Sequence, residues 1–213
     1  MKITKLGHCC LVIEENGKRI MTDPGSYTIA EQGKKKNIDF ILITHEHPDH
    51  FHVESLKVIM DANPNVLVIT NSAVGKLMNE AGLKHEILEG KSSKDFSGIF
   101  LEAHDCKHEE IFEEIGQVQN TGYFIGTRLF YPGDSFFNPG KPVEILALPV
   151  GGPWVRVRDF MRYVLEVKPK ICFPVHDGML QNSFGTAHRV PNMVLPKFDI
   201  IFKDFEGNNT EEF

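Results

Sequence analysis

The sequence lacks an apolar run close to the roughly 20 residues that a membrane-spanning helix requires, so we expect no membrane span. Residues 1–5 lead directly into a strand-like pattern without the apolar segment of a signal peptide, which predicts a cytoplasmic protein. Basic residues are outnumbered: 23 lysines and arginines stand against 29 aspartates and glutamates, for a formal net charge of −6. Because nucleic-acid-binding proteins normally carry a basic face, we expect no nucleic-acid partner.

Cysteine is also scarce. Cys9, Cys10, Cys106 and Cys172 form no CxxC pair and no disulfide framework, so we expect reduced, buried thiols. Cys106 lies two residues beyond His104, a candidate ligand discussed below, and it either lines a site there or packs in the core.

The remaining composition is that of a soluble globular protein, with 41% hydrophobic and 24% charged residues. Its 213 residues fit one domain spanning residues 1–213. Asn16-Gly17 predicts a type I′ hairpin, in which both central residues adopt positive φ, and Gly126-Thr127 marks a second hairpin. Strands dominate both halves of the chain and helices accompany them, which predicts a sandwich of sheets covered by helices.

The apolar and turn patterns also predict the bounds of individual elements. Strands are expected at residues 3–13, 20–22, 38–43, 66–70, 84–89, 99–103, 122–125, 128–131, 145–150, 171–173 and 198–202. Helices are expected at residues 53–60, from an N-cap at Ser72 to Glu80, and at residues 158–167; loops or turns are expected at residues 31–37, 91–95 and 105–120, and a frayed end at residues 208–213.

Four groups able to bind a metal lie within residues 45–50, just after the buried strand expected at 38–43. Pro48 prevents a helix from running through this stretch, so His45 and His47 can turn towards one metal and Asp49 and His50 towards a second. Imidazole with carboxylate suits zinc, and also iron, manganese or nickel. Histidine clusters also occur as tag remnants or solvated loops, but this one is internal, includes an aspartate and follows a strand.

Three more ligand-type residues follow strand-like runs: His104 after residues 99–103, Asp134 after residues 130–133 and His176 after residues 171–175. Taken alone, each would more often be structural. Together with the 45–50 stretch, they predict that scattered imidazoles and carboxylates converge around a pair of cations. Placement of His104 or His176 far from the 45–50 loop would contradict this prediction.

The HxHxDH spacing of His45, His47, Asp49 and His50 resembles the signature of the metallo-β-lactamase superfamily. The resemblance extends to Asp23 as an early structural aspartate, to His104, to Gly133-Asp134-Ser135 as a GD[ST] motif and to His176. It implies an α/β (α+β) fold with a four-layer αββα sandwich. It also implies two divalent ions, with zinc as first choice: His45, His47 and His104 at metal 1, Asp49, His50 and His176 at metal 2, and Asp134 as the bridge.

The same resemblance implies a dinuclear metal-dependent hydrolase. A hydroxide shared by metals about 3.5–4 Å apart would attack a carbonyl or phosphoryl centre, and Asp49 would orient it as the catalytic carboxylate. The opening Leu6-Gly7-His8-Cys9-Cys10 and residues 148–152 resemble the branch of small bacterial metal-dependent hydrolases, ascorbate-6-phosphate lactonases and N-acylphosphatidylethanolamine phospholipases D. In that branch His8 would lie near the metals, as a support or substrate contact; alternatively it is a strand histidine with a hydrogen-bonded ring.

The substrate stays open, because residues 152–156 and Asp177-Gly178 depart from that branch. We expect no room for a nuclease cap, a helical glyoxalase-type domain or a flavodiiron module, and no lactam hydrolysis. Trp154 either walls the pocket or belongs to the core. Positive charge near the site, or alternatively a solvated face, is expected from a group of five residues: Lys107, His108, Arg156, Arg158 and Arg162.

Three functions remain. The first is hydrolysis of a small ester, lactone or phosphoester, with a small molecule as the only required partner and a homo-oligomer left open. The second is a phosphodiesterase acting on a nucleotide or lipid head group. The third is a metal-binding scaffold without catalysis, which the complete ligand set disfavours.

Overall fold

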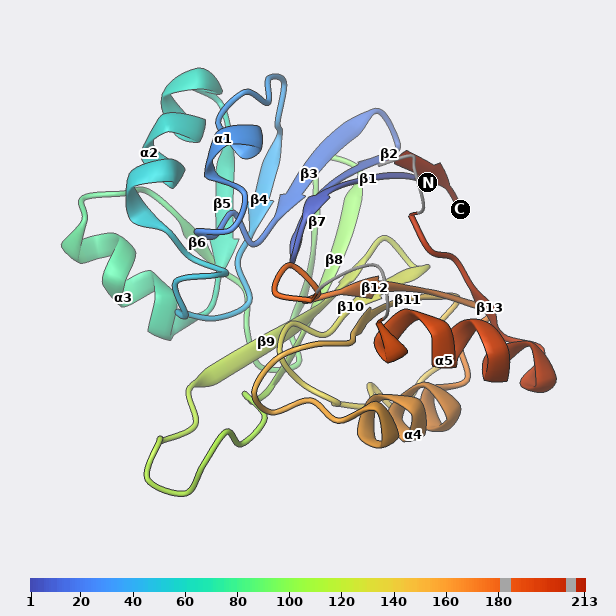
Figure 1. The fold of residues 1–213 in the computed structure, drawn as a ribbon. Coiled ribbons are helices and arrows are strands. Elements are labelled where there is room, and N and C mark those ends of the chain that lie inside the picture. Colours follow the sequence, from blue (N-terminus) through green and yellow to red (C-terminus); the bar gives the residue numbers. More distant parts are fainter. Residues whose placement is uncertain (181–184, 206–209) are drawn as a thin grey trace.

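A computed structural model describes residues 1–180, 185–205 and 210–213. Two seven-stranded sheets face each other, in the strand orders β14-β1-β2-β3-β4-β5-β6 and β13-β12-β11-β10-β9-β8-β7. Helices α1, α2 and α3 lie outside the first sheet, and α4 and α5 lie outside the second (Figure 1). The predicted αββα sandwich is therefore confirmed.

The bounds of the elements follow the predicted pattern in most of the chain. The first sheet contains β1 (Lys2–Gly7), β2 (Cys10–Glu15), β3 (Lys18–Thr22), β4 (Phe40–Leu42), β5 (Leu67–Thr70), β6 (Glu86–Ile87) and β14 (Thr210–Glu212). The second contains β7 (Ser93–Phe96), β8 (Ile99–Lys107), β9 (Gln119–Ile125), β10 (Leu129–Tyr131), β11 (Ile145–Pro149), β12 (Ile171–Val175) and β13 (Ile201–Phe202). The helices are α1 (Ile29–Gln32), α2 (Val53–Ala62), α3 (Ser72–Glu80), α4 (Val157–Val167), α5 (Thr186–Val194) and the 3-10 turn η2 (Leu195–Phe198).

Alternation along the strands separates three apolar layers. In β4, Phe40 and Leu42 point into the core between the sheets, whereas Ile41 packs against the helices outside the first sheet. In β12, Phe173 joins the central core and Cys172 packs beneath α4 and α5. Burial on both faces explains why these strands read as nearly continuous apolar runs.

Several local predictions are confirmed and several need correction. Asn16 and Gly17 have φ of 50° and 72°, as the predicted type I′ hairpin requires. Helix α3 is capped by Asn71, whose side chain accepts a hydrogen bond from the Val74 N–H, and not by Ser72. The predicted polar turn at residues 91–95 contains the start of β7, which is polar because it is an edge strand with three exposed residues.

The C-terminal predictions also change. Residues 210–212 are not frayed: they form β14, which pairs antiparallel with β1, while Asn208 lies outside the described residues. The edge strand expected at residues 198–202 is limited to β13, because Phe198 ends a 3-10 turn. The longest helix of the described residues, α4, has 11 residues, and within that part of the chain no helix could cross a bilayer.

The arrangement of the sheets places the ligand candidates at one edge. β3, β4 and β5 run parallel in the first sheet, and β10, β11 and β12 run parallel in the second. The carboxyl ends of β4, β10 and β12 lead into the loops that carry residues 45–50, Asp134 and His176. Both sheets therefore contribute to one site.

Candidate metal centre

The loop after β4 directs some of its side chains into the interior and others towards solvent. Both His50 and Phe51 donate backbone N–H bonds to the His47 carbonyl, which closes the turn around Pro48. His45 and His50 are fully buried and their ring centroids are 4.0 Å apart. His47 is half-buried and the Asp49 side chain keeps 23% of its exposure, so the loop reaches solvent at these two residues.

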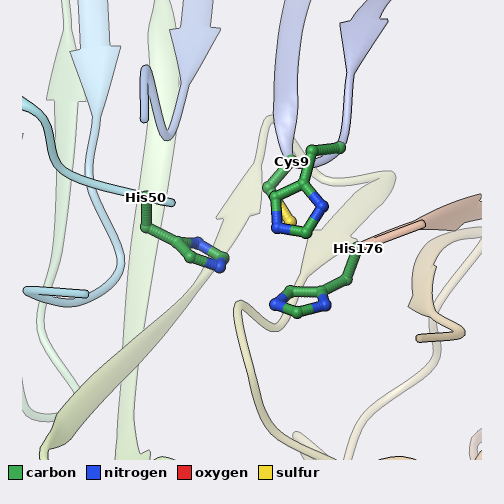
Figure 2. Close-up of side chains that lie close together, drawn as sticks. Cys9, His50 and His176 are labelled. Atoms are coloured by element: carbon green, nitrogen blue, oxygen red, sulfur yellow. The ribbon is translucent and has the colours of Figure 1, made fainter. Parts of the chain in front are cut away.

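His176 lies opposite this loop at the end of β12. Its ring is stacked on that of His50 at a centroid distance of 5.3 Å, and Figure 2 shows the two imidazoles on either side of a common space. The His176 backbone N–H donates to the His8 carbonyl, at 3.2 Å, which ties the end of β12 to the turn after β1.

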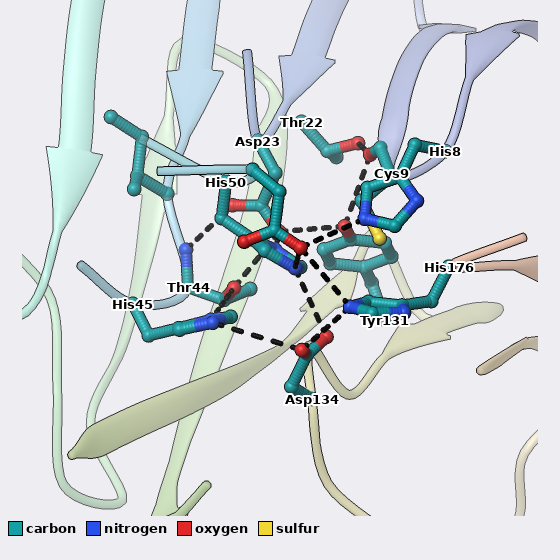
Figure 3. A network of polar contacts seen from close by, with 12 residues as sticks. His8, Cys9, Thr22, Asp23, Thr44, His45, His50, Tyr131, Asp134 and His176 are labelled. Carbon is teal, nitrogen blue, oxygen red and sulfur yellow. Dashed lines mark hydrogen bonds and ion pairs between the residues drawn. The ribbon is translucent and has the colours of Figure 1, made fainter. Parts of the chain in front are cut away.

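Asp134 occupies the centre of the cluster (Figure 3). One carboxylate oxygen, Oδ1, lies 3.1 Å from His50 Nε2, and the other, Oδ2, lies 2.8 Å from His176 Nε2. Oδ2 is also 3.2 Å from His108 Nε2 and 3.8 Å from His45 Nε2. Asp134 is 2% exposed, and its carboxylate faces imidazoles from both sheets.

Gly133 allows Asp134 to take this position. It has φ of 66°, and a Cβ there would lie 2.3 Å from Asn120 Oδ1 and 2.8 Å from Thr44 Cβ. The Asn120 amide donates to the Pro132 carbonyl and its oxygen accepts from the Asp134 N–H. The GD motif is thus clamped against the neighbouring strand.

The prediction that His104 joins His45 and His47 is wrong, so the predicted convergence is contradicted for His104 and holds for Asp134 and His176. In β8, Leu101 and Ala103 face the core between the sheets, so the alternation of the strand directs His104 to the opposite face. The His104 ring contacts Phe124, at a centroid distance of 5.7 Å, and its Nε2 lies 2.7 Å from Glu102 Oε1.

His108 takes the place predicted for His104. It follows the end of β8, is 2% exposed, and its ring centroid lies 4.6 Å from that of His47 and 5.1 Å from that of His45. The sequence contained one signal for this choice: the apolar residues at 99, 101 and 103 mark the buried face, and His104 is out of phase with them.

Three imidazoles near Asp134, those of His45, His50 and His108, are oriented by hydrogen bonds at Nδ1, the nitrogen far from the cluster. Asp23 Oδ2 accepts from His50 Nδ1, at 2.8 Å. The Thr44 hydroxyl donates to Asp23 and therefore accepts from His45 Nδ1, at 3.0 Å. His108 Nδ1 donates to the Glu109 carbonyl, at 2.6 Å. These Nδ1 contacts direct Nε2 of each ring to the cluster, the arrangement that supports metal-bound histidines.

The two other predicted supporting residues also touch the cluster. His8 Nδ1 accepts from the Gly178 N–H, so its Nε2–H donates to Asp49 Oδ2, at 3.0 Å. Trp154 is buried, with its ring 5.6 Å from the rings of both His108 and His176. His8 lies in the turn between β1 and β2 with φ of 49°, and not within a strand.

The remaining candidates lie outside the cluster. Cys106 is half-buried, contrary to the expected full burial, and it contacts the Asn120 amide. Arg156 and Arg158 have side chains that are 76% and 58% exposed and pair with Asp159. Lys107 and Arg162 are exposed as well. These four cations therefore lie in solvent and not beside the ligands, as the second of the two alternatives predicted.

The donor atoms fit divalent metal ions. Among the described residues, four buried atoms make no aligned hydrogen bond, although Asp134 oxygens lie 3.1 Å and 2.8 Å from two of them: His45 Nε2, His50 Nε2, His176 Nε2 and Asp134 Oδ1. Such an arrangement costs free energy unless a ligand satisfies it. Three groups of described residues have ligand atoms within 4.8 Å of one another, and two of them contain the predicted ligands: His45, His47 and His108, and Asp49, His50, Asp134 and His176.

The charges of the groups fit as well. Burial lowers the pKa of His45 well below its usual value and also lowers that of His47, so both are neutral, the form that binds a metal. Burial alone would raise the pKa of Asp134, but His50 and His176 hold it well below its usual range, so this buried carboxylate is charged. Burial alone would lower the pKa of His50 and His176, but the Asp134 carboxylate holds both well above the usual value, so an ion that binds there would displace their protons.

Comparison with known proteins agrees with this geometry. Residues 2–176 match the model of the beta-lactamase superfamily domain, and the chain therefore belongs to the metallo-β-lactamase superfamily. It is 31% identical over 191 residues to a UPF0173 protein of Pyrococcus furiosus, covering 84% of each chain. It is 25% identical over 194 residues to a UPF0173 metal-dependent hydrolase of Carboxydothermus hydrogenoformans, covering 83% of this chain and 84% of the relative.

A solved structure supports the fold alone. A metallo hydrolase from the archaeon Ignicoccus hospitalis superposes with a TM-score of 0.74 at 16% identity, covering 100% of this chain and 98% of that one.

Proposed function

We propose that this metal-dependent hydrolase of the metallo-β-lactamase superfamily holds two divalent ions and hydrolyses a small ester, lactone or phosphoester. Zinc is the first choice of metal, with manganese, iron and nickel as alternatives. The observation that carries the proposal is the convergence of two ligand groups on the Asp134 carboxylate. Because the ligands come from both sheets, residues 1–213 are taken as one domain.

The ligand assignment follows the two groups. His45, His47 and His108 hold the first ion, and a second set holds the other: Asp49, His50 and His176. Asp134 lies between the sets, with Oδ1 towards His50 and Oδ2 towards His108 and His176, so it is the bridging ligand. Two such ions supply Lewis-acid stabilisation of developing negative charge and make water a better nucleophile.

Asp49 is the catalytic carboxylate in this proposal. One of its oxygens accepts the His8 Nε2–H, and its side chain keeps 23% of its exposure, so a substrate from solvent could reach it. A carboxylate held in this way can orient a water molecule and accept its proton. His8 is a positioning residue, because it acts on the reaction only through Asp49.

The charge distribution favours an ester or lactone over a phosphodiester of a nucleotide or lipid head group. A phosphodiester would gain from a buried cation beside the ligands. Arg156 and Arg158 instead lie on an exposed face and pair with Asp159. The scaffold alternative is disfavoured, since both ligand groups are complete.

The test combines metal analysis with substrate panels. Protein stripped with a chelator and reloaded with zinc should bind two ions per chain and hydrolyse members of a lactone and ester panel faster than bis-p-nitrophenyl phosphate. Asp134→Ala should weaken binding of both ions and lower kcat/KM by about 100-fold or more. Unchanged stoichiometry in Asp134→Ala would remove the bridging assignment, and no turnover by the fully loaded protein would favour the scaffold.

A further inference from the structure

Cys9 lies on the side of the His50–His176 pair that faces the interior of the sandwich. Its Sγ and one ring nitrogen each of His8, His50 and His176 all lie within 4.8 Å of one another, and all four residues are buried. Figure 2 shows the Cys9 sulfur above the His176 ring, on the side from which the turn that carries Cys9 approaches. This set shares His50 and His176 with the second ligand group but brings a thiol in place of the carboxylates.

The backbone keeps the sulfur in this position. The Cys9 carbonyl accepts the Thr22 hydroxyl, at 2.8 Å, and lies 3.0 Å from the Tyr131 hydroxyl oxygen, whose single proton has its shorter contact with Asp23, at 2.6 Å. Cys9 is 1% exposed and packs in the core between the sheets. Its backbone therefore contacts residues of both sheets, and its side chain is enclosed by the core.

The imidazoles of His50 and His176, next to Cys9, each have a ring nitrogen available to bind a metal ion. Within the described part of the chain, His50 Nε2 and His176 Nε2 are buried and have no hydrogen-bond partner. His50 and His176 are members both of the carboxylate-containing group and of the group with Cys9. An ion held by these two histidines would therefore have carboxylate oxygens and the Cys9 sulfur within reach.

We propose that Cys9 is a further ligand at the second metal position and that its sulfur makes this position selective for thiophilic ions. Thiolate ligands favour zinc, cadmium and copper(I), whereas manganese and magnesium favour oxygen. On binding a divalent ion, the Cys9 thiol forms the sulfur–metal bond and releases its proton to solvent, with no change of oxidation state. This role of Cys9 rests on the second ligand set of the proposed function.

Cys10 is the matched control. It is also 1% exposed, but it packs with Val12 and Met21 in the layer between the first sheet and its helices. Its thiol therefore points away from the metal position. This equally buried cysteine, adjacent in sequence, thus packs in a different apolar layer from Cys9.

The experiment titrates chelator-stripped protein with Cd²⁺ and with Mn²⁺, following ultraviolet thiolate-to-cadmium absorption and calorimetric affinity. The wild-type chain and Cys10→Ser should both develop the absorption band. Cys9→Ser should lose it and bind Cd²⁺ about tenfold or more weakly, with a smaller change for Mn²⁺. An unchanged band in folded Cys9→Ser, or Cd²⁺-loaded wild-type protein without a band, would overturn the role of Cys9.

Two further measurements keep the outcomes distinct. If Cys9→Ser does not fold, a chain in which Cys9 is the only cysteine must retain the band, and its absence there would count against Cys9. Failure of both Cd²⁺ and Mn²⁺ to bind would contradict the proposed metal centre itself. Binding of both ions with hydrolysis but without thiolate absorption would remove only the inference about Cys9.

Discussion

Asp23 joins three segments of the chain through one buried carboxylate. Its two oxygens accept from the Thr44 N–H and hydroxyl, from His50 Nδ1 and from the Tyr131 hydroxyl. Thr44 and His50 flank the ligand loop, and Tyr131 comes from the other sheet. Each contact is between 2.6 and 2.8 Å. At the scale of single residues, hydrogen bonds to one carboxylate therefore fix the orientation of His50 and the position of the loop that carries the ligands.

Gly25 sets the position of the same loop from its other side. A Cβ at residue 25 would lie 1.8 Å from the Asp49 carbonyl oxygen, so the loop would have to move. We expect Gly25→Ala to lower the free energy of unfolding by about 2 kcal/mol or more and to weaken metal binding. Urea denaturation and metal titration measure the two effects.

Gly116→Ala is the control, because a Cβ at residue 116 meets no atom within 4 Å. It should change stability by less than about 0.5 kcal/mol. A Gly25→Ala protein as stable as this control would contradict the close approach of residue 25 to Asp49.

At the scale of elements, β8 and the loop that follows it decide which histidine reaches the metals. Within the strand, alternation commits His104 to the face that contacts Phe124. Beyond the strand, that constraint ends, and the His108 N–H pairs with the Val118 carbonyl while its ring turns to Asp134. Two histidines four residues apart therefore have different surroundings.

This difference predicts opposite results for two equivalent substitutions. His108→Ala should lose tight binding of one ion per chain, because it removes a ligand of the first metal, and should lower kcat/KM by about 100-fold. His104→Ala should keep two ions and most of the activity, although loss of its packing should reduce stability by about 1–2 kcal/mol. Metal analysis and unfolding curves on both variants distinguish the two positions; loss of a metal in His104→Ala alone would reverse the assignment.

At the scale of the whole molecule, a network of charged side chains joins the two ends of the chain to the strand that carries His176. Lys5 of β1 lies 2.5 Å from Asp177, which follows His176 directly. His188 of α5 lies 3.3 Å from Asp177 and 2.8 Å from Asp204. These residues border a cavity of about 250 Å³ that also includes His8.

The network predicts a dependence of stability on pH. Hydrogen bonds to Asp177 and Asp204 raise the pKa of His188 from 6.5 to about 9. Since the folded-state pKa lies above the unfolded one, the contribution of His188 is complete below about pH 6.5 and is lost as the pH rises through about 9. The wild-type protein should therefore exceed His188→Gln in stability by about 1 kcal/mol at neutral pH.

Urea denaturation of both proteins at several pH values measures this contribution. The difference between them should shrink towards zero above about pH 9. Curves that stay parallel from neutral to alkaline pH would show that His188 carries no such charge in the folded state.

Much of the fold could be predicted from local pattern. The apolar run before residues 45–50 and the Asn16-Gly17 turn act over a few residues, so both were readable without tertiary contacts. The C-terminal strand was missed because residues 210–212 become ordered only by pairing with β1 at the opposite end of the chain. The edge strand β7 was missed because its polar residues match a turn equally well.

The sequence pattern by itself predicted sheets covered by helices and the convergence of the 45–50 loop with Asp134 and His176, because ligand-type residues follow several strand-like runs. The resemblance to the superfamily implied the αββα order of the layers. Only the tertiary structure decided that His108 replaces His104, that Asp23 reaches Tyr131, and that the Cys9 sulfur faces the His50–His176 pair. These three results depend on which face a side chain takes and on contacts between sheets, and distant parts of the chain set both.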